Sequence, residues 1–328
     1  MDMIIPDAAA VPPLPPRFLA PAGLRWGMFR ASDGTALRWA HLPGADAHIG
    51  CVLVGGFAEF AEKYYETMAD LHACGMDVWL LDWRSQGGSQ RAAHNPTRPL
   101  ARDFDRDAAD LAEFTNAMLP APARRIVVAH SMGAATALLA LAGQPDLFAA
   151  AVLSAPMLRI ATGNIPYAIA RLIARAGVTF GFAAAFAPGC GPWQEDPQIA
   201  ANSVCSHDPL RAELEQAWFL AQPRLRLDGP TYGWIDSAIK LSARLMRPET
   251  LRRVDTPVLI GCPGDDAFVD PSAEERAAQS LPVCTLVHFD TARHELFCET
   301  DLIRNAWFTA IDDFLAAHIG AERIRTAS

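Results

Sequence analysis

Short apolar segments alternate with helical patterns along most of the chain. Residues 49–54 form a continuous apolar run that ends in two glycines, which is typical of a strand buried on both faces. Strands that alternate with helices predict an α/β fold with a mostly parallel sheet and helices on both faces. Further strand-like runs lie at residues 77–81, 125–129, 150–154, 257–262 and 284–289. Helical patterns lie at residues 61–74, 104–118, 131–142 and 301–318, and after Pro271.

The first 41 residues predict a hairpin that follows a leader. Residues 25–31 and 35–41 have strand character around the turn Ser32-Asp33-Gly34, so antiparallel strands are expected at one edge of the sheet. Residues 1–24 are rich in proline, which predicts an extended leader. They contain no basic stretch followed by an apolar run, so we do not expect a standard signal peptide.

Residues 158–253 differ from the rest of the chain because helical periodicity dominates and the strand pattern is absent. We interpret them as a helical cap inserted into an α/β core of residues 25–157 and 254–328. The large apolar residues of the cap would either line an acyl-chain pocket with affinity for lipid surfaces or pack the cap onto the core. We expect most of them to pack and a few to line the pocket: Ile165, Ile169, Leu172, Ile173, Phe180, Phe182, Phe186, Trp193, Trp218, Phe219 and Trp234.

The net charge and its distribution limit the choice of partner. The 328-residue chain carries 28 Lys and Arg against 37 Asp and Glu, and its formal net charge of -9 argues against a nucleic-acid partner. Between Arg159 and Arg253, however, eleven basic residues stand against eight acidic ones, a local net charge of +3. This excess leaves two interpretations open: a mildly basic cap that makes transient contact with a membrane surface, and an ordinary scatter of surface charge.

Cysteine usage indicates the compartment. The seven cysteines are odd in number, form no C-x-x-C pair, and several lie within strand-like apolar runs. This favours reduced thiols in a cytoplasmic protein over a disulfide framework, and no zinc-ligand spacing is present. No apolar run has the length of a transmembrane helix, since the nearest one, residues 176–187, is too short.

The strongest chemical signal is the stretch Ala129-His130-Ser131-Met132-Gly133. It follows a predicted strand and opens an alanine-rich predicted helix, so Ser131 would lie on a sharp turn with its hydroxyl at the carboxyl end of the sheet. Small residues two positions before and after the serine avoid collisions in such a turn. Ser131 is therefore the candidate nucleophile.

A serine nucleophile needs a base, and the base needs an orienting acid. His294 follows the last predicted strand and would serve as the base. Asp265 and Asp266 follow the preceding strand, and the spacing alone leaves both open as the acid. His130 is a rival base, but beside Ser131 in a tight turn its ring would point elsewhere.

A third element is expected where the strand at residues 49–54 ends in Gly55-Gly56-Phe57. Such a glycine-rich turn lets backbone N–H groups face a developing negative charge on oxygen. The candidate oxyanion-hole donors are the amides of Phe57 and Met132. A plain turn that only ends a strand is the alternative.

From about Arg25 onward, these motifs resemble the lysophospholipase and monoacylglycerol-lipase branch of the α/β-hydrolase superfamily, a group of serine hydrolases. The resemblance rests on Gly55-Gly56-Phe57-Ala58-Glu59, Asp82-Trp83-Arg84-Ser85-Gln86-Gly87-Gly88-Ser89, the stretch around Ser131, Gly229-Pro230-Thr231-Tyr232-Gly233-Trp234, Asp266-Ala267-Phe268-Val269-Asp270-Pro271, and Ala292-Arg293-His294-Glu295. The register of the acid motif selects Asp266 over Asp265. Relatives carry a histidine at the place of Gly55, and its loss would loosen the oxyanion loop. Ala129 replaces a glycine and is small enough to be tolerated.

The resemblance implies ester hydrolysis through an acyl-enzyme, with Ser131, His294 and Asp266 as the triad and without metal or organic cofactor. The expected substrate is a small acyl ester, in particular a monoacyl lipid such as a lysophospholipid or a monoglyceride. Three alternatives stay open: an acyltransferase with the same triad, another hydrolase such as a peptidase, thioesterase or carbon–carbon hydrolase, and a non-catalytic ligand-binding relative.

Overall fold

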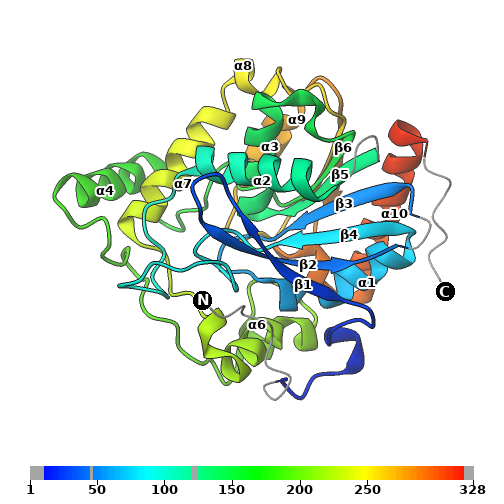
Figure 1. Ribbon diagram of the computed structural model, residues 1–328. Coiled ribbons are helices and arrows are strands. Elements are labelled where there is room, and N and C mark those ends of the chain that lie inside the picture. The colour runs from blue at the N-terminus through cyan, green and yellow to red at the C-terminus, as the bar shows by residue number, and fades with distance from the viewer. Residues whose placement is uncertain (1–10, 45–46, 120–123, 321–328) are drawn as a thin grey trace.

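One eight-stranded sheet forms the centre of the molecule in the computed structural model, which describes residues 11–44, 47–119 and 124–320 (Figure 1). The strand order is β1-β2-β4-β3-β5-β6-β7-β8. Strand β2 runs antiparallel to β1 and β4, and all other neighbouring pairs are parallel. The predicted α/β fold, with a hairpin at one edge of a mostly parallel sheet, is therefore confirmed. The strands are β1 Arg25–Arg30, β2 Ala36–Leu42, β3 Ile49–Val54, β4 Met76–Leu81, β5 Arg124–His130, β6 Ala150–Ser154, β7 Val258–Pro263 and β8 Cys284–Phe289.

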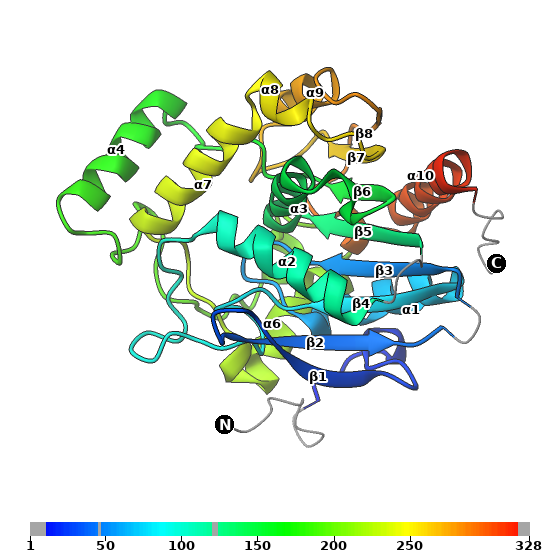
Figure 2. The same cartoon turned by 45° about the horizontal axis from the view of Figure 1, so that its top comes forward.

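Helices cover both faces of this sheet (Figure 2). On one face lie α2 Phe104–Met118, α3 Ser131–Gly143 and α9 Pro271–Ala278, whose apolar side chains join one buried cluster with residues of β3 to β7. On the other face lie α1 Tyr65–Ala73 and α10 Asp301–Ile319, which pack on the alternate residues of the same strands. This division follows from the strand geometry, because successive side chains point to opposite faces.

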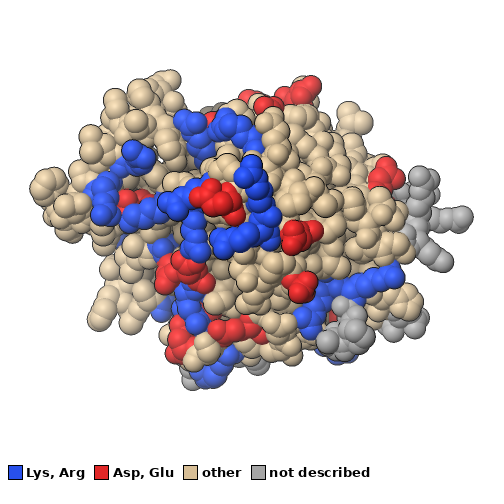
Figure 3. Space-filling view, turned by 90° about the horizontal axis from the view of Figure 1, so that it is seen from above, with Lys and Arg blue, Asp and Glu red and all other residues tan. Residues whose placement is uncertain are grey.

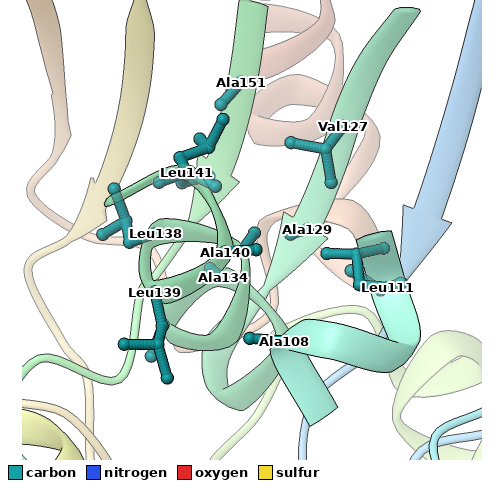
Figure 4. Close-up of a cluster of buried hydrophobic side chains, with 14 of the residues drawn as sticks. Ala108, Leu111, Val127, Ala129, Ala134, Leu138, Leu139, Ala140, Leu141 and Ala151 are labelled. Carbon is teal, nitrogen blue, oxygen red and sulfur yellow. The ribbon is translucent and has the colours of Figure 1, made fainter. Parts of the chain in front are cut away.

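Helix α3 lies at the heart of the first cluster (Figure 4). Every residue from Ser131 to Ala142 is buried. Its alanines let the helix approach β5 and β6 closely on one side and α2 on the other. A helix that is apolar all round needs such neighbours, and they fix the position of its first residue, Ser131.

Residues 158–253 contain helices but no extended strand, and the structure describes them all. Phe186 and Thr231 form an isolated β-bridge within them. The division of the chain into core and cap stays a prediction. The helices of this stretch, called the cap segment below, are α4 Tyr167–Thr179, α5 Ile199–Asn202, α6 Pro209–Ala221, α7 Tyr232–Leu245 and α8 Pro248–Leu251.

Two expectations of local structure differ from the result. Residues 11–24, expected to be extended, contain a 3₁₀ turn at Pro16–Phe18, and the Phe18 side chain is buried. Residues 61–74 do not form one helix, because a 3₁₀ turn at Ala61–Tyr64 precedes α1. The turn directs the polar side chains of Glu62 and Lys63 into buried ion pairs. The first ten residues lie outside the described part. Among the described residues, no helix combines the length and the apolar character needed to cross a membrane.

Candidate active site

Ser131 lies on the sharp turn between β5 and α3. Its φ is +50°, a left-handed conformation that costs a non-glycine residue of order 1–3 kcal/mol. Gly133 is required beside it, since a Cβ there would lie 2.4 Å from the carbonyl oxygen of Gly55. Ala129 occupies the matching position in β5 and is fully buried, so its methyl group is accommodated.

A chain of two hydrogen bonds joins the three predicted triad residues. Ser131 Oγ lies 3.0 Å from Nε2 of His294, and Nδ1 of the same ring lies 2.6 Å from Asp266 Oδ2. The three residues follow β5, β8 and β7, so parallel strands that end at one edge of the sheet bring them together. With Nδ1 bound to the carboxylate, Nε2 is free to accept the serine proton.

The structure distinguishes between the two neighbouring aspartates. The Asp266 side chain is 1% exposed, and its second oxygen accepts the backbone N–H groups of Phe268 and Val269 at 2.7 and 3.0 Å. Burial raises the pKa of Asp266, but the hydrogen bonds from His294 and the two amides outweigh it, so the pKa falls below its usual value. Asp265, by contrast, has a side chain that is 70% exposed and lies 3.9 Å from Arg293. Of these two carboxylates, Asp266 is therefore the one that is hydrogen-bonded to the His294 imidazole.

The two predicted oxyanion donors come from separate elements. Met132 is the second residue of α3, so its N–H has no acceptor within the helix and lies at the positive end of the helix dipole. Phe57 lies in the loop after β3, and in the described part of the chain its N–H donates to no other group. A Cβ on Gly56 would lie 3.1 Å from the Cβ of Ser131, so this loop runs directly against the serine.

Buried side chains hold the loop at residues 55–58, called the oxyanion loop below, on both sides. Trp83 Nε1 donates to Gly55 O at 2.8 Å, and Gln86 Nε2 donates to Gly56 O at 3.0 Å. From the other side, the Gly56 N–H donates to a Glu59 carboxylate oxygen. These bonds engage both carbonyl groups and the Gly56 N–H, so the backbone of the loop is held in one conformation, and preorganised backbone donors are what an oxyanion hole requires.

Tyr64 takes the space that a side chain at position 55 would need. A Cβ on Gly55 would lie 3.0 Å from Tyr64 Cε2 and 3.0 Å from Glu59 Oε2. The Tyr64 hydroxyl donates to the same Glu59 oxygen at 2.5 Å. Tyr64 and Glu59 therefore pack against Gly55 in this chain, and the expected loosening of the oxyanion loop relative to relatives stays a prediction.

His130 does not compete with His294 for the serine. Its ring is 3% exposed and meets the His294 ring edge-on, with the centroids 4.7 Å apart. Burial lowers the pKa of His130 to about 4, so the ring is neutral near pH 7. Its Nδ1 has no hydrogen-bond partner within the described chain. The interpretation of His130 as a packing residue agrees with this position.

A buried polar cluster next to the triad residues was not predicted from the sequence. Glu59, His130 and Glu295 bring their ligand atoms within 4.8 Å of one another, a spacing that could hold a metal ion. Lys63 Nζ, however, donates to Glu59 at 2.9 Å and to Glu295 at 2.7 Å. An ammonium thus already supplies positive charge between these carboxylates. In the sequence, Glu59, Lys63 and Glu295 are charged residues in or near the predicted catalytic motifs, and this does not reveal that their side chains meet.

An aromatic residue of the cap segment packs against the oxyanion loop. Trp234 at the start of α7 is buried, and its ring lies 4.3 Å from the ring of Phe57. Trp234 and Gln86 also line a hollow of about 400 Å³ whose other walls come mainly from residues 84–106. The hollow lies between the loop after β4 and the cap segment, and no residue of the oxyanion loop lines it.

Comparisons with known proteins identify the family of the chain. A family model described as serine aminopeptidase, S33, matches residues 45–301. Lysophospholipase L2 of Escherichia coli K12 is 30% identical over 279 residues, which cover 81% of this chain and 80% of that protein. These matches confirm the resemblance inferred from the motifs.

Solved structures support the fold. A soluble variant of monoglyceride lipase from Saccharomyces cerevisiae, in complex with a substrate analogue, has a TM-score of 0.68 at 21% identity over 90% of this chain and 96% of that one. A thermostable carboxyl esterase from Bacillus coagulans has a TM-score of 0.70 at 16% identity over 91% of this chain and 100% of that one. The chain therefore belongs to the S33 serine aminopeptidase family of α/β-hydrolases and is a distant relative of lysophospholipase L2.

Proposed function

We propose that this protein cleaves carboxylic esters through an acyl-enzyme, with Ser131 as nucleophile, His294 as general base and Asp266 as the orienting acid. The observation that carries the proposal is the continuous hydrogen-bond chain from Ser131 Oγ through His294 to Asp266. It stands beside an oxyanion loop whose backbone is fixed by buried side chains.

In the first step, Ser131 Oγ attacks the ester carbonyl while His294 Nε2 takes the hydroxyl proton. The amides of Phe57 and Met132 stabilise the tetrahedral oxyanion, and the loss of one such donor costs about 10²–10³-fold in rate. The alcohol leaves with the proton from His294. Water then attacks the acyl-enzyme with His294 as base again, which releases the acid and restores Ser131.

The proposed substrate is a monoacyl lipid ester, such as a lysophospholipid or a monoglyceride. The name of the 30% identical relative, lysophospholipase L2, supports this class. Exposure on the cap segment supports it too. Of the eleven apolar residues expected mostly to pack, six are exposed, so that expectation is wrong for them: Ile165, Ile169, Leu172, Ile173, Phe180 and Phe182.

The exposed apolar face of α4 also suits contact with a lipid surface. Helix α4 lies against α7 through small residues: Ala174 is buried, and a Cβ on Gly177 would collide with the Tyr232 ring. Its larger side chains, such as Leu172 at 68% exposure, therefore face solvent. Lys and Arg, with some Asp and Glu among them, lie on the face of the molecule that carries α4 and α7 (Figure 3). An apolar helix face beside basic residues is typical of helices that lie in an anionic membrane interface.

The activity test compares the purified protein with Ser131→Ala on p-nitrophenyl esters of increasing acyl length, followed by lysophosphatidylcholine and monoacylglycerol. Turnover that disappears in Ser131→Ala is expected, with a preference for longer chains. A strong preference for short esters would overturn the lipid substrate. Cleavage of aminoacyl naphthylamides without ester cleavage would overturn the ester hydrolase, and acyl transfer to added glycerol in excess of hydrolysis would make it a transferase.

Flotation with vesicles tests the proposed lipid contact. We expect vesicles with 30 mol% phosphatidylglycerol to bind the protein, and Leu172→Asp to weaken the binding. Leu302→Asp is the matched control, since Leu302 is 83% exposed but lies on α10 and not on α4. Equal effects of the two substitutions would refute a contact through α4.

We also propose that the protein acts in the cytoplasm. All seven cysteines are free thiols, which suits a reducing compartment. Secretion of the full chain from its native host, detected with an antibody in the culture medium, would contradict this proposal.

A further inference from the structure

Lys63 is unusual in this chain because of both its type and its position. The chain has 28 Lys and Arg residues, but only Lys63 and Lys240 are lysines. Lys63 lies in the 3₁₀ turn before α1, and its side chain is 3% exposed. A buried ammonium is costly unless carboxylates surround it, so its partners explain why it is there.

Its partners belong to the two loops on either side of the catalytic serine. Glu59 accepts a hydrogen bond of 2.9 Å from Lys63 Nζ, and it also accepts one from the Gly56 N–H of the oxyanion loop. Glu295 accepts a hydrogen bond of 2.7 Å from Lys63 Nζ, and it is the residue directly after His294. Lys63 thus bridges the loop that carries Phe57 and the loop that carries the general base.

We propose that Lys63 is a positioning residue that sets the distance between the oxyanion loop and His294. This inference rests on the proposed ester hydrolysis. Lys63 touches neither substrate nor Ser131, and it acts through Glu59 on one side and Glu295 on the other.

The electrostatics of the cluster agree with this role. Burial acts to lower the pKa of Lys63, but the three carboxylates around it outweigh burial and hold the pKa well above its usual value. For Glu59, burial acts in the opposite direction and would raise the pKa, but Lys63 and the other partners of Glu59 lower the pKa to about 2. Lys63 and Glu59 are therefore both charged near neutral pH.

The bridge also extends into the cap segment. Glu215 on α6 lies 3.5 Å from Lys63 Nζ. The stretch before α6 is hydrogen-bonded to the histidine loop, since Glu295 N donates to Cys205 O at 3.0 Å and Arg293 Nη1 donates to Ser203 O at 2.6 Å. The α6 side of the cap segment and the histidine loop therefore form one hydrogen-bonded unit that Lys63 connects to the oxyanion loop.

The test compares Lys63→Met with Lys240→Met, the other lysine of the chain. Lys240 is the matched control because its side chain is 60% exposed and pairs with Asp236 four residues away. On a soluble p-nitrophenyl ester, we expect Lys63→Met to lower kcat by about 10²-fold with little change in KM, because a small displacement of catalytic groups costs that much. Lys240→Met should stay within twofold of wild type.

A second measurement separates positioning from general damage. An alkyl boronic acid forms a tetrahedral adduct with Ser131 Oγ and occupies the oxyanion hole, so its inhibition constant reports the alignment of the site. We expect this constant to rise with Lys63→Met in proportion to the loss in kcat/KM, and Lys63→Arg to recover at least tenfold of that loss. If Lys63→Met does not fold, Lys63→Met/Glu295→Gln keeps the net charge of the cluster and takes its place.

The outcomes are distinct. A folded Lys63→Met with wild-type kcat, or a loss in kcat with unchanged boronic acid affinity, overturns the positioning role while ester hydrolysis stands. An equal loss in Lys240→Met overturns it as well. If the wild-type protein shows no ester cleavage that depends on Ser131, the proposed function is wrong, and this inference is wrong with it.

Discussion

Gly133 connects the packing of α3 to the shape of the oxyanion hole, so its substitution by alanine should damage catalysis more than stability. A Cβ at this position would lie 2.4 Å from Gly55 O and 3.0 Å from Val54 O, both of them backbone atoms. Because ordinary van der Waals contacts begin near 3.4 Å, the oxyanion loop or the start of α3 must move by about 1 Å. Either movement shifts an oxyanion donor relative to Ser131.

The two expected magnitudes differ clearly. Overpacking costs about 1–3 kcal/mol, while alanine in place of glycine within a helix regains about 1 kcal/mol. The net loss in the free energy of unfolding is therefore at most about 2 kcal/mol, or about 3 °C in Tm for a chain of this size. A misplacement of 1 Å at the site, by contrast, costs about 10²-fold in kcat.

The assay measures kcat on p-nitrophenyl butyrate at 25 °C, where the variant remains folded, together with Tm. Gly143→Ala is the control, because it lies in the same helix and nothing lies within 4 Å of its added Cβ. It should keep wild-type kcat and an equal or slightly higher Tm. A Gly133→Ala variant with kcat within threefold of wild type would refute the reasoning.

Three more predictions follow from the same geometry. Asp266→Asn should lower kcat by about 10⁴-fold through loss of the correct His294 tautomer, whereas Asp265→Asn should stay within threefold; similar losses in ester-cleavage assays would contradict the assignment. His130 has a native pKa of about 4 against about 6.5 in the unfolded chain, so the stability it contributes is complete above pH 6.5 and is lost as the pH falls through 4. Urea unfolding between pH 7.5 and 4.5 should show this loss, and His130→Gln should remove part of it; identical slopes would count against the buried neutral ring. Burial raises the pKa of Cys74 and Cys284 to about 12, so native protein at pH 8 should react slowly with iodoacetamide at both thiols, and rapid labelling by mass spectrometry would contradict their burial.

The sequence by itself determined the fold class and predicted the serine and the histidine that the structure brings together. Strand-like runs ahead of Ser131, Asp266 and His294 were local features, and parallel strands bring their carboxyl ends to one edge of the sheet in any such fold. The choice between Asp265 and Asp266 was weaker, because neighbouring residues share the same local pattern. It rested on a resemblance until the structure placed Asp266 Oδ2 2.6 Å from the histidine.

Only the tertiary structure decided what supports the site. Lys63 and Glu295 are 232 residues apart in the chain, and their ion pair depends on how two loops meet, which no local pattern encodes. The exposed side of α4 was hidden for a similar reason. The pattern showed an apolar face, but the packing of Ala174 and Gly177 toward α7 decided that this face would lie in solvent. Helix periodicity specifies which residues share a face, whereas only the neighbouring elements determine which face is covered.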